Sequence, residues 1–310
     1  MKRTKLLTAA MLILLACPGF ALASFEKAWS VRGEGLGRSG LALFSDINAL
    51  FINPASIVAL EDLQGYMQYR SEFPGLDNDS LKHSRIAYSQ SFGEPGAMGA
   101  YLDYFHSALY RELSLSVSLA RPFKILIPLE AGFAAVYLNK KFISNKYTVS
   151  DPLFAGTGYS KSGGTINAGL RYKALGKLMA ALVLDNIIST DISLAKNKSD
   201  VPPFTIAAGL SYLPAPSFSH SLDVSYIAAA SYGSRKYNIK FGVEKWFELP
   251  YYISAAAVRA GINLDQAACG FGFRFKQSGI KGEINYSFSY PLNGLFATFG
   301  THNISLQSGF

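Results

Sequence analysis

The sequence predicts an all-β fold: a closed antiparallel transmembrane β-barrel of about 14 strands, with a short, partly helical N-terminal plug, or hatch. Three observations support this prediction: a secretion signal at the N-terminus, a repeated alternation of apolar and small polar residues, and connections that are alternately long and short. The chain is 49% hydrophobic and 14% aromatic, yet no apolar run is long enough for a transmembrane helix. We expect a signal peptide over residues 1–23, a plug segment over 24–62 and the barrel over 63–310.

The N-terminus has the features of a secretory signal peptide. Three of the first five residues are basic, an apolar stretch follows, and small residues place the expected cleavage after Ala23. Attachment of lipid to Cys17 remains an alternative. Cleavage after Ala23 would lower the formal net charge from +8 to +5, a modest excess that requires no nucleic-acid partner. The signal and the strand pattern together predict the outer membrane of a Gram-negative-type bacterium, with its lipid and the barrel assembly machinery as partners.

The strand pattern is clearest over residues 113–120. Every second residue there is Leu or Val, and the residues between them are Ser or Ala. A period of two is typical of a strand, and the face carrying Leu115 and Val117 is predicted to contact lipid. Three further stretches alternate as clearly, over 205–212, 270–275 and 284–290. Weaker matches surround ten aromatic or aliphatic residues: Tyr66, Tyr88, Tyr101, Phe133, Ile166, Leu182, Val224, Phe241, Ile253 and Ile304.

The connections between these stretches differ in length in an ordered way. The first, over residues 72–82, is long and polar, and the second, over 93–95, is tight. The fifth, over 139–164, is the longest, and the sixth, over 173–177, is short again. Membrane barrels have long outer loops and short periplasmic turns, whereas a soluble β-sandwich has no reason to sort its loops in this way.

The last predicted strand ends on an aromatic residue. Phe310 closes the sequence, and Ile304 and Leu306 lie in the same register. An apolar last strand with a terminal aromatic residue resembles the signal that is read by the barrel assembly machinery. These three residues are therefore the candidate assembly signal.

Both ends of the chain resemble known outer-membrane families. The stretch from Gly35 through Gly37 and Gly40 to Asn53-Pro54-Ala55 resembles the N-terminal signature of PorV-type proteins, and residues 284–288 and 300–306 resemble their last hairpin. The Asn-Pro-Ala motif is also similar to the hatch of FadL-like fatty-acid channels. The likeness to FadL implies a channel for small, mostly apolar molecules, and the likeness to PorV implies a partner-binding barrel that serves protein secretion or surface attachment. The channel, with an apolar ligand, is the expected function, and the partner-binding barrel, with a secreted protein partner, is the alternative.

The plug segment supplies the candidate gate residues. Asn53 can cap a helix, and Pro54 suits a first helical turn, so a short helix is expected from Ala55. Gly35, Gly37 and Gly40 give the preceding backbone the freedom to fold tightly inside a barrel. The less apolar strand faces are rich in Ser, Gly and Ala, which predicts a weakly polar lumen with room for a plug and an apolar ligand.

No catalytic, cofactor or metal site is expected. The four histidines are scattered, and cleavage after Ala23 would leave Cys269 as the one cysteine. No nucleophile stands beside a base in a recognisable motif. A surface lipid-modifying enzyme remains a remote alternative.

Overall fold

The computed structural model describes twelve stretches of the chain, residues 29–60, 63–75, 80–124, 127–146, 148–151, 154, 158–195, 199–228, 236–250, 252–277, 280–293 and 298–309. The expected signal peptide, with Cys17 and Ala23, lies outside the described residues, as does Phe310. Within the described residues, no helix combines the length and apolar character needed to cross a membrane.

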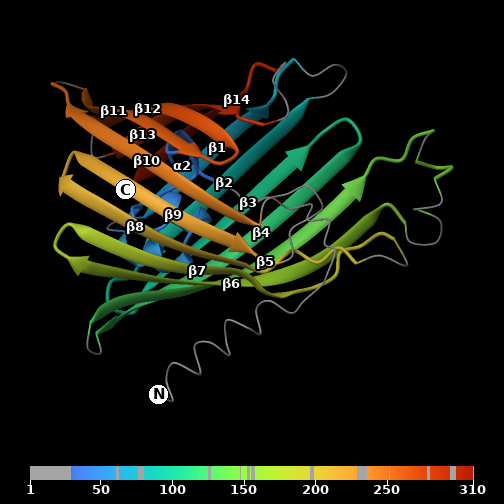
Figure 1. Ribbon diagram of the computed structural model, residues 1–310, viewed down its shortest axis with the longest axis horizontal. Helices are drawn as coiled ribbons and strands as arrows, with labels where there is room; N and C mark the ends of the chain where they lie inside the picture. Colours follow the sequence, from blue (N-terminus) through green and yellow to red (C-terminus); the bar gives the residue numbers. More distant parts are fainter. Residues whose placement is uncertain are drawn as a thin grey trace.

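Fourteen antiparallel strands close into a barrel, as predicted (Figure 1). Each strand pairs with its neighbours in sequence, and β14 pairs with β1 to close the ring. The strands are β1 Gln64–Glu72, β2 Leu81–Ser91, β3 Ala97–His106, β4 Tyr110–Lys124, β5 Pro128–Phe142, β6 Ser160–Leu175, β7 Leu178–Ser189, β8 Thr205–Ala215, β9 Phe218–Ile227, β10 Tyr237–Glu248, β11 Ile253–Asn263, β12 Gln266–Gln277, β13 Ile280–Pro291 and β14 Thr301–Gly309.

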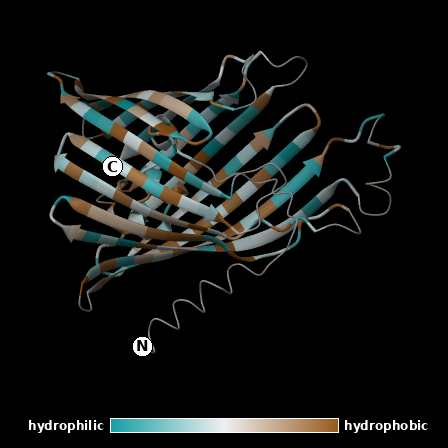
Figure 2. Ribbon diagram, viewed as in Figure 1, coloured by the Kyte–Doolittle hydropathy of each residue, from teal (hydrophilic) through white to brown (hydrophobic). Residues whose placement is uncertain are grey.

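The two faces of the wall follow the predicted alternation. On β4, Leu115 and Leu119 are 43% and 62% exposed, whereas Ser116 and Ser118 are buried. Figure 2 shows the same change of hydropathy along neighbouring strands. The apolar face therefore points to the membrane, and the small polar face points into the lumen.

Connection lengths orient the barrel. Those that follow β1, β5 and β7 are long, and those that follow β6 and β8 have two residues each. Because long loops mark the outer side of such barrels, we call this side the outer end and the opposite side the periplasmic end. The first strand begins and the last strand finishes at the periplasmic end.

Residues 29–60, which we call the lumen segment, fold inside this ring (Figure 1). The segment contains the helix α2 (Val31–Gly35) and two 3-10 helices, η1 (Ile47–Phe51) and η2 (Pro54–Ala59). It supplies most of the buried apolar cluster, including Leu41, Phe44 and Ile57. Towards the wall of the barrel, α2 contacts β11 to β14, whereas η2 contacts β2 to β6. The segment therefore reaches across the lumen from one side of the wall to the other.

Candidate functional site

Side chains at the starts of the three helices fix the local shape of the lumen segment. Ser30 Oγ accepts a hydrogen bond from Gly33 N at 3.1 Å, and Asp46 Oδ1 accepts one from Asn48 N at 3.0 Å. Asn53 Oδ1 accepts one from Ala55 N at 3.1 Å, and Pro54 takes the first helical position. Caps of this kind satisfy backbone donors that a short helix leaves unpaired. A short helix capped by Asn53 with Pro54 in its first turn matches the sequence-based expectation, although this helix is of the 3-10 type.

A chain of buried ion pairs joins the segment to the wall at β10 and β11. Arg32 donates to both carboxylate oxygens of Glu244 at 2.6 and 2.8 Å, and its remaining amino group contacts Asp46 at 2.6 Å. Glu244 also accepts a hydrogen bond from Arg259 Nε at 2.6 Å. Arg259 continues the chain through Nη1 to Asn285 at 2.7 Å. Bidentate Arg–carboxylate pairs of this kind are strong and geometrically specific.

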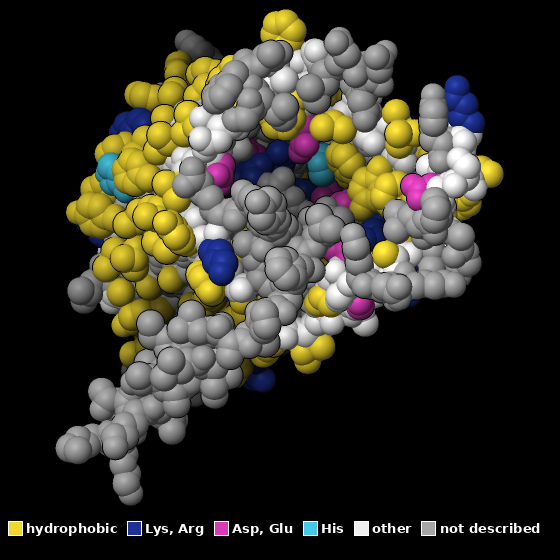
Figure 3. Space-filling model, turned by 45° about the vertical axis from the view of Figure 1, so that its right-hand side comes forward, with side chains coloured by type: hydrophobic (Ala, Val, Ile, Leu, Met, Phe, Trp, Pro, Cys, Tyr) yellow, Lys and Arg dark blue, Asp and Glu magenta, His cyan; other side chains and the backbone are white. Residues whose placement is uncertain are grey.

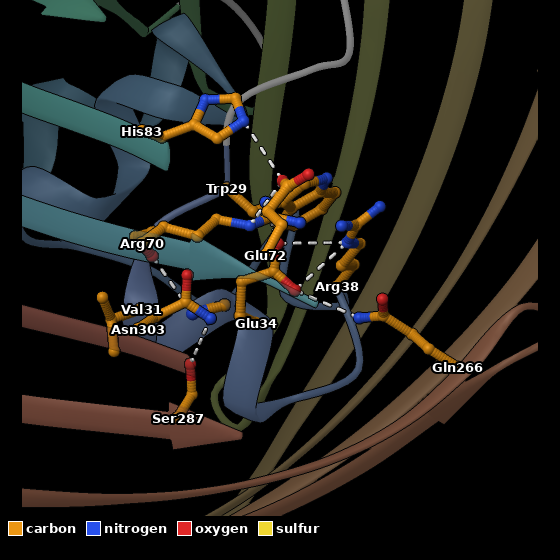
Figure 4. Close-up of polar contacts among 12 residues, drawn as sticks. Trp29, Val31, Glu34, Arg38, Arg70, Glu72, His83, Gln266, Ser287 and Asn303 are labelled. Atoms are coloured by element: carbon orange, nitrogen blue, oxygen red, sulfur yellow. Dashed lines mark hydrogen bonds and ion pairs between the residues drawn. The ribbon is translucent and has the colours of Figure 1, made fainter. Parts of the chain in front are cut away.

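A second charged cluster surrounds Glu34 on α2, nearer the outer end (Figure 4). Arg38 and Arg70 contact its carboxylate at 3.1 and 3.0 Å, and Gln266 donates a hydrogen bond to it at 3.1 Å. Burial alone would raise the pKa of Glu34, but the charges of Arg38 and Arg70 and the hydrogen bonds from Arg38 and Gln266 outweigh it and lower the pKa to about 2. Glu34 is therefore a carboxylate at every physiological pH.

Wall side chains also hold the backbone of the segment directly. Asp223 Oδ2 accepts hydrogen bonds from Gly40 N and Leu41 N at 2.7 and 3.0 Å. Arg171 donates to the carbonyl oxygen of Phe44 at 2.7 Å, and Arg85 donates to that of Trp29 at 2.9 Å. These contacts come from β9, β6 and β2, so the wall fixes the segment from several directions.

Glycines on the inner wall lie where the lumen segment packs most closely against it, and we call these positions the glycine seats. A Cβ on Gly132 would lie 2.6 Å from the carbonyl carbon of Pro54, and one on Gly209 would lie 2.8 Å from Cβ of Leu41. Three more wall glycines are equally close to residues of the segment: Gly169 to Asn53, Gly242 to Leu36 and Ser39, and Gly261 to Leu36 and Gly37. Only residues without a side chain allow two backbones to approach this closely.

The structure places all six gate candidates within the lumen segment and buries them. Asn53 lies against Gly169 of β6, and its amide donates to the carbonyl oxygens of Leu41 and Leu170 at 3.2 and 3.3 Å. Pro54 and Ala55 lie against Gly132. Gly35 lies against Gly270, and Gly37 has a φ of +66° beside the backbone of β11. Gly40 has a φ of +116° and packs against the ring of Phe44.

The two described residues of the candidate assembly signal lie on the membrane face of β14. Ile304 and Leu306 are 51% and 45% exposed there. Their role in assembly stays a prediction.

The expectation of a weakly polar lumen is wrong. Buried charges face the lumen from the wall, among them Arg85, Arg171, Glu244, Arg259 and Glu283. Only a few charges stand on each of these strands, and Arg259 is the one charged residue of β11, so they change the overall composition little. The signal that could have identified a charged lumen is a charge on the small-residue face of a predicted strand. Such a charge points inward and requires a partner there.

Hollows lie on either side of the segment. At the periplasmic end, two cavities of about 450 and 630 Å³ both reach Asp46 and Arg274. At the outer end, Figure 3 shows a hollow in which Lys, Arg, Asp, Glu and His side chains gather. The ion pairs of His83 with Glu72 and of Lys140 with Asp200 also lie in the outer half of the lumen. Within the described stretches, no group of three potential metal ligands comes together.

Solved structures share this architecture. The Ralstonia pickettii toluene transporter TbuX is 12% identical, with 91% of this chain and 97% of that chain covered and a TM-score of 0.58. A Pseudomonas aeruginosa FadL homologue is 12% identical over 94% of this chain and 99% of its own, with a TM-score of 0.60. The CymD monoaromatic hydrocarbon channel is 11% identical over 91% and 99%, also at 0.60. At these identities the likeness shows a FadL-like barrel fold.

Comparison of the sequence with known families identifies the family of this chain. No curated protein matches the chain. A family model described as type IX secretion system membrane protein PorP/SprF matches residues 41–307, from the middle of the lumen segment to β14. The narrower likeness to PorV-type proteins is not confirmed. Because the match covers most of its length, the chain belongs to the PorP/SprF family of type IX secretion outer-membrane proteins.

Proposed function

We propose that this protein serves type IX secretion as a closed barrel that binds a partner protein at the membrane. The observation that carries the proposal is the lumen segment, which spans the lumen and is tied to opposite sides of the wall by ion pairs and glycine seats. A barrel filled in this way offers its two ends and its outer surface to a partner. The family supports a role in secretion.

The charged contacts favour a closed resting state. If the segment left the lumen, Asp223 and Arg171 would lose their contacts with its backbone, and Glu244 would keep only Arg259. Separating buried charges from their partners is strongly unfavourable unless water or another ligand replaces them. The larger periplasmic cavity is also lined by charged residues such as Arg32, Asp46 and Glu244, whereas sites for apolar ligands are mostly apolar.

Three sequence-based predictions belong to this proposal. Residues 1–23 direct the chain to export, and Phe310 with Ile304 and Leu306 directs its assembly into the outer membrane. Residues 24–62 act as a plug, and the gate candidates at Gly35, Gly37, Gly40 and Asn53 to Ala55 hold it closed.

The test is a gene deletion combined with cross-linking in cells. Cells without the protein should retain in the periplasm one or more proteins that are normally secreted, and the intact gene should restore their export. Cross-linking of a tagged, functional copy should capture either a secretion component or a secreted protein. Normal secretion in the deletion strain, together with no cross-link to any such protein, would contradict the proposal.

A channel for small apolar molecules is the second candidate. The fold of hydrocarbon transporters favours it, and so does an apolar hollow of about 580 Å³ on the membrane face. This hollow lies over β1 to β3, β13 and β14 and is lined by side chains such as Met67, Ile86 and Leu306. This candidate predicts that the deletion strain takes up labelled toluene more slowly than the complemented strain while its secretion is normal. Equal uptake in the two strains would reject it.

A further inference from the structure

Four basic residues form a continuous row across neighbouring strands at the outer end. The register pairs Lys82 of β2 with His106 of β3, His106 with Arg111 of β4, and Arg111 with Lys141 of β5. Residues directly opposite one another in antiparallel strands share a face of the sheet. The adjacent residue Lys140 is buried in the lumen, so Lys141 and the other three point to the membrane side. We call these four residues the basic row.

The cations of the basic row lack the partners that lumen cations have. Within the described parts of the chain, Lys82, Arg111 and Lys141 make no side-chain hydrogen bond or ion pair. By contrast, Arg32 and Arg259 in the lumen both contact carboxylates. Arg111 and Lys141 face each other directly across strands about 4.8 Å apart, and like charges in that position destabilise a sheet. The row therefore favours an anion that lies across it.

The height of the basic row on the wall indicates which anion this is. The register row two residues nearer the periplasm contains two tyrosines and three other residues, Tyr69, Ser84, Tyr104, Leu113 and Asn139. The next row is mostly aliphatic and contains Met67, Ile86, Leu102, Leu115 and Tyr137. Each step of two residues is about 7 Å along a strand. Moving outward, the membrane face thus changes from mostly apolar residues, through a mixed row with two tyrosines, to basic residues, which follows the order of hydrocarbon, interface and headgroup in a membrane.

We propose that the basic row is a binding site for the phosphate groups of an anionic lipid headgroup in the outer leaflet. Arg111 can bind a phosphate through two parallel N–H groups, and Lys82 and Lys141 act as point charges on either side. The four side chains cover three strand spacings, about 14 Å, which is wide enough for more than one phosphate. The row continues the lipid-facing surface directly, so a membrane lipid reaches it without leaving the bilayer. This site is independent of the lumen segment and of the proposed role in secretion.

The test compares lipid binding by purified full-length protein and two charge-matched triple variants. The first variant combines Lys82→Gln, Arg111→Gln and Lys141→Gln. The control combines Arg121→Gln, Lys173→Gln and Lys276→Gln, which remove three exposed cations from the periplasmic end. The probes are phosphatidylcholine nanodiscs that contain either a doubly phosphorylated glucosamine lipid or its dephosphorylated form, with bound lipid counted by native mass spectrometry. Heat-modifiable migration reports whether each variant is folded.

The wild type and the control variant should bind the phosphorylated lipid with similar affinity, and the basic-row variant should bind it about 100-fold more weakly. A single Arg111→Lys variant keeps the charge and should retain most of the binding. Equal binding of the phosphorylated and dephosphorylated lipids would overturn the proposal. So would a folded basic-row variant that binds the phosphorylated lipid as the wild type does, whether or not it loses a cross-link to a secreted protein.

Discussion

The two halves of the lumen segment differ in how far charged side chains of their own hold them in the barrel. Residues 29–40 contain Arg32 and Glu34, whose charges are paired with wall residues on β10 and β1. Residues 41–60 contain no charge other than Asp46, and they pack through apolar side chains and through the glycine seats on β5 and β6. Leu36, Gly37 and Ser39 of the first half also rest on the glycine seats at Gly242 and Gly261. The first half is therefore sensitive to charge and pH as well as to volume, whereas the second half is sensitive mainly to volume. A signal that opens the barrel through charge would act on residues 29–40 first.

Removing the charge of Glu244 should have the largest effect on how firmly residues 29–40 are held in the barrel. Glu244→Gln leaves Arg32 and Arg259 without their shared carboxylate inside the barrel. Breaking a buried ion pair in this way costs about 3–5 kcal/mol. Urea unfolding in detergent measures the loss of stability, and planar-bilayer recordings should show more frequent openings. Glu248→Gln, at an exposed position on the same strand, should leave both unchanged. Equal behaviour of the two variants would contradict the importance of this ion pair.

Lowering the pH should weaken the attachment of residues 29–40 to the wall, because it protonates Glu34. The folded-state pKa of about 2 lies below the ordinary value of 4.5, so the carboxylate stabilises the docked state above about pH 4.5, and this is lost as pH falls towards 2. The full contribution is about 3 kcal/mol. Conductance should thus be constant from pH 8 to pH 5 and should rise below pH 4.5. In Glu34→Gln this acid-dependent rise should be absent, and a rise of the same size would assign the response to another group.

Added volume at a glycine seat should destabilise the packing of residues 41–60, with a smaller effect on stability than the loss of a buried charge. Gly132→Ala places a methyl group 2.6 Å from the Pro54 backbone, so the segment or β5 must shift. Overpacking of this kind costs about 1–3 kcal/mol. Gly65→Ala on β1 provides the control, because its added methyl group would meet its nearest neighbour at 3.5 Å, an ordinary contact. Thermal unfolding should separate the two variants, and equal midpoints would show that the glycine seat is not tightly fitted.

The features that the sequence predicts correctly depend on neighbouring residues. All fourteen strands follow from a period of two, and the capped turn at Asn53-Pro54 follows from residues two positions apart. The orientation of β4 follows from the contrast between Leu115 and Ser116. In each case the physical cause, pleating or local capping, acts over a few residues and is visible in a short window.

The features that the sequence does not reveal depend on residues far apart in the chain. Arg32 and Glu244 are separated by 212 positions, and neither stands in a charged run. The glycine seats are spread over several strands, where each glycine resembles a weak position in a strand rather than part of a common surface. Composition alone therefore predicts a weakly polar lumen. Buried charges would be costly without partners, but inside the barrel they are paired, and this pairing is not visible in the composition.

The central claim is that the lumen segment closes the barrel, and a deletion tests it most directly. Removal of residues 33–58 takes out most of α2, all of η1 and most of η2, and it leaves all fourteen strands intact. Heat-modifiable migration and circular dichroism establish that the variant is an assembled barrel, and single-channel recording in planar bilayers then compares it with the full-length protein. We expect a stable conductance far above that of the full-length protein. An assembled deletion variant whose conductance equals that of the full-length protein would show that other residues close the lumen.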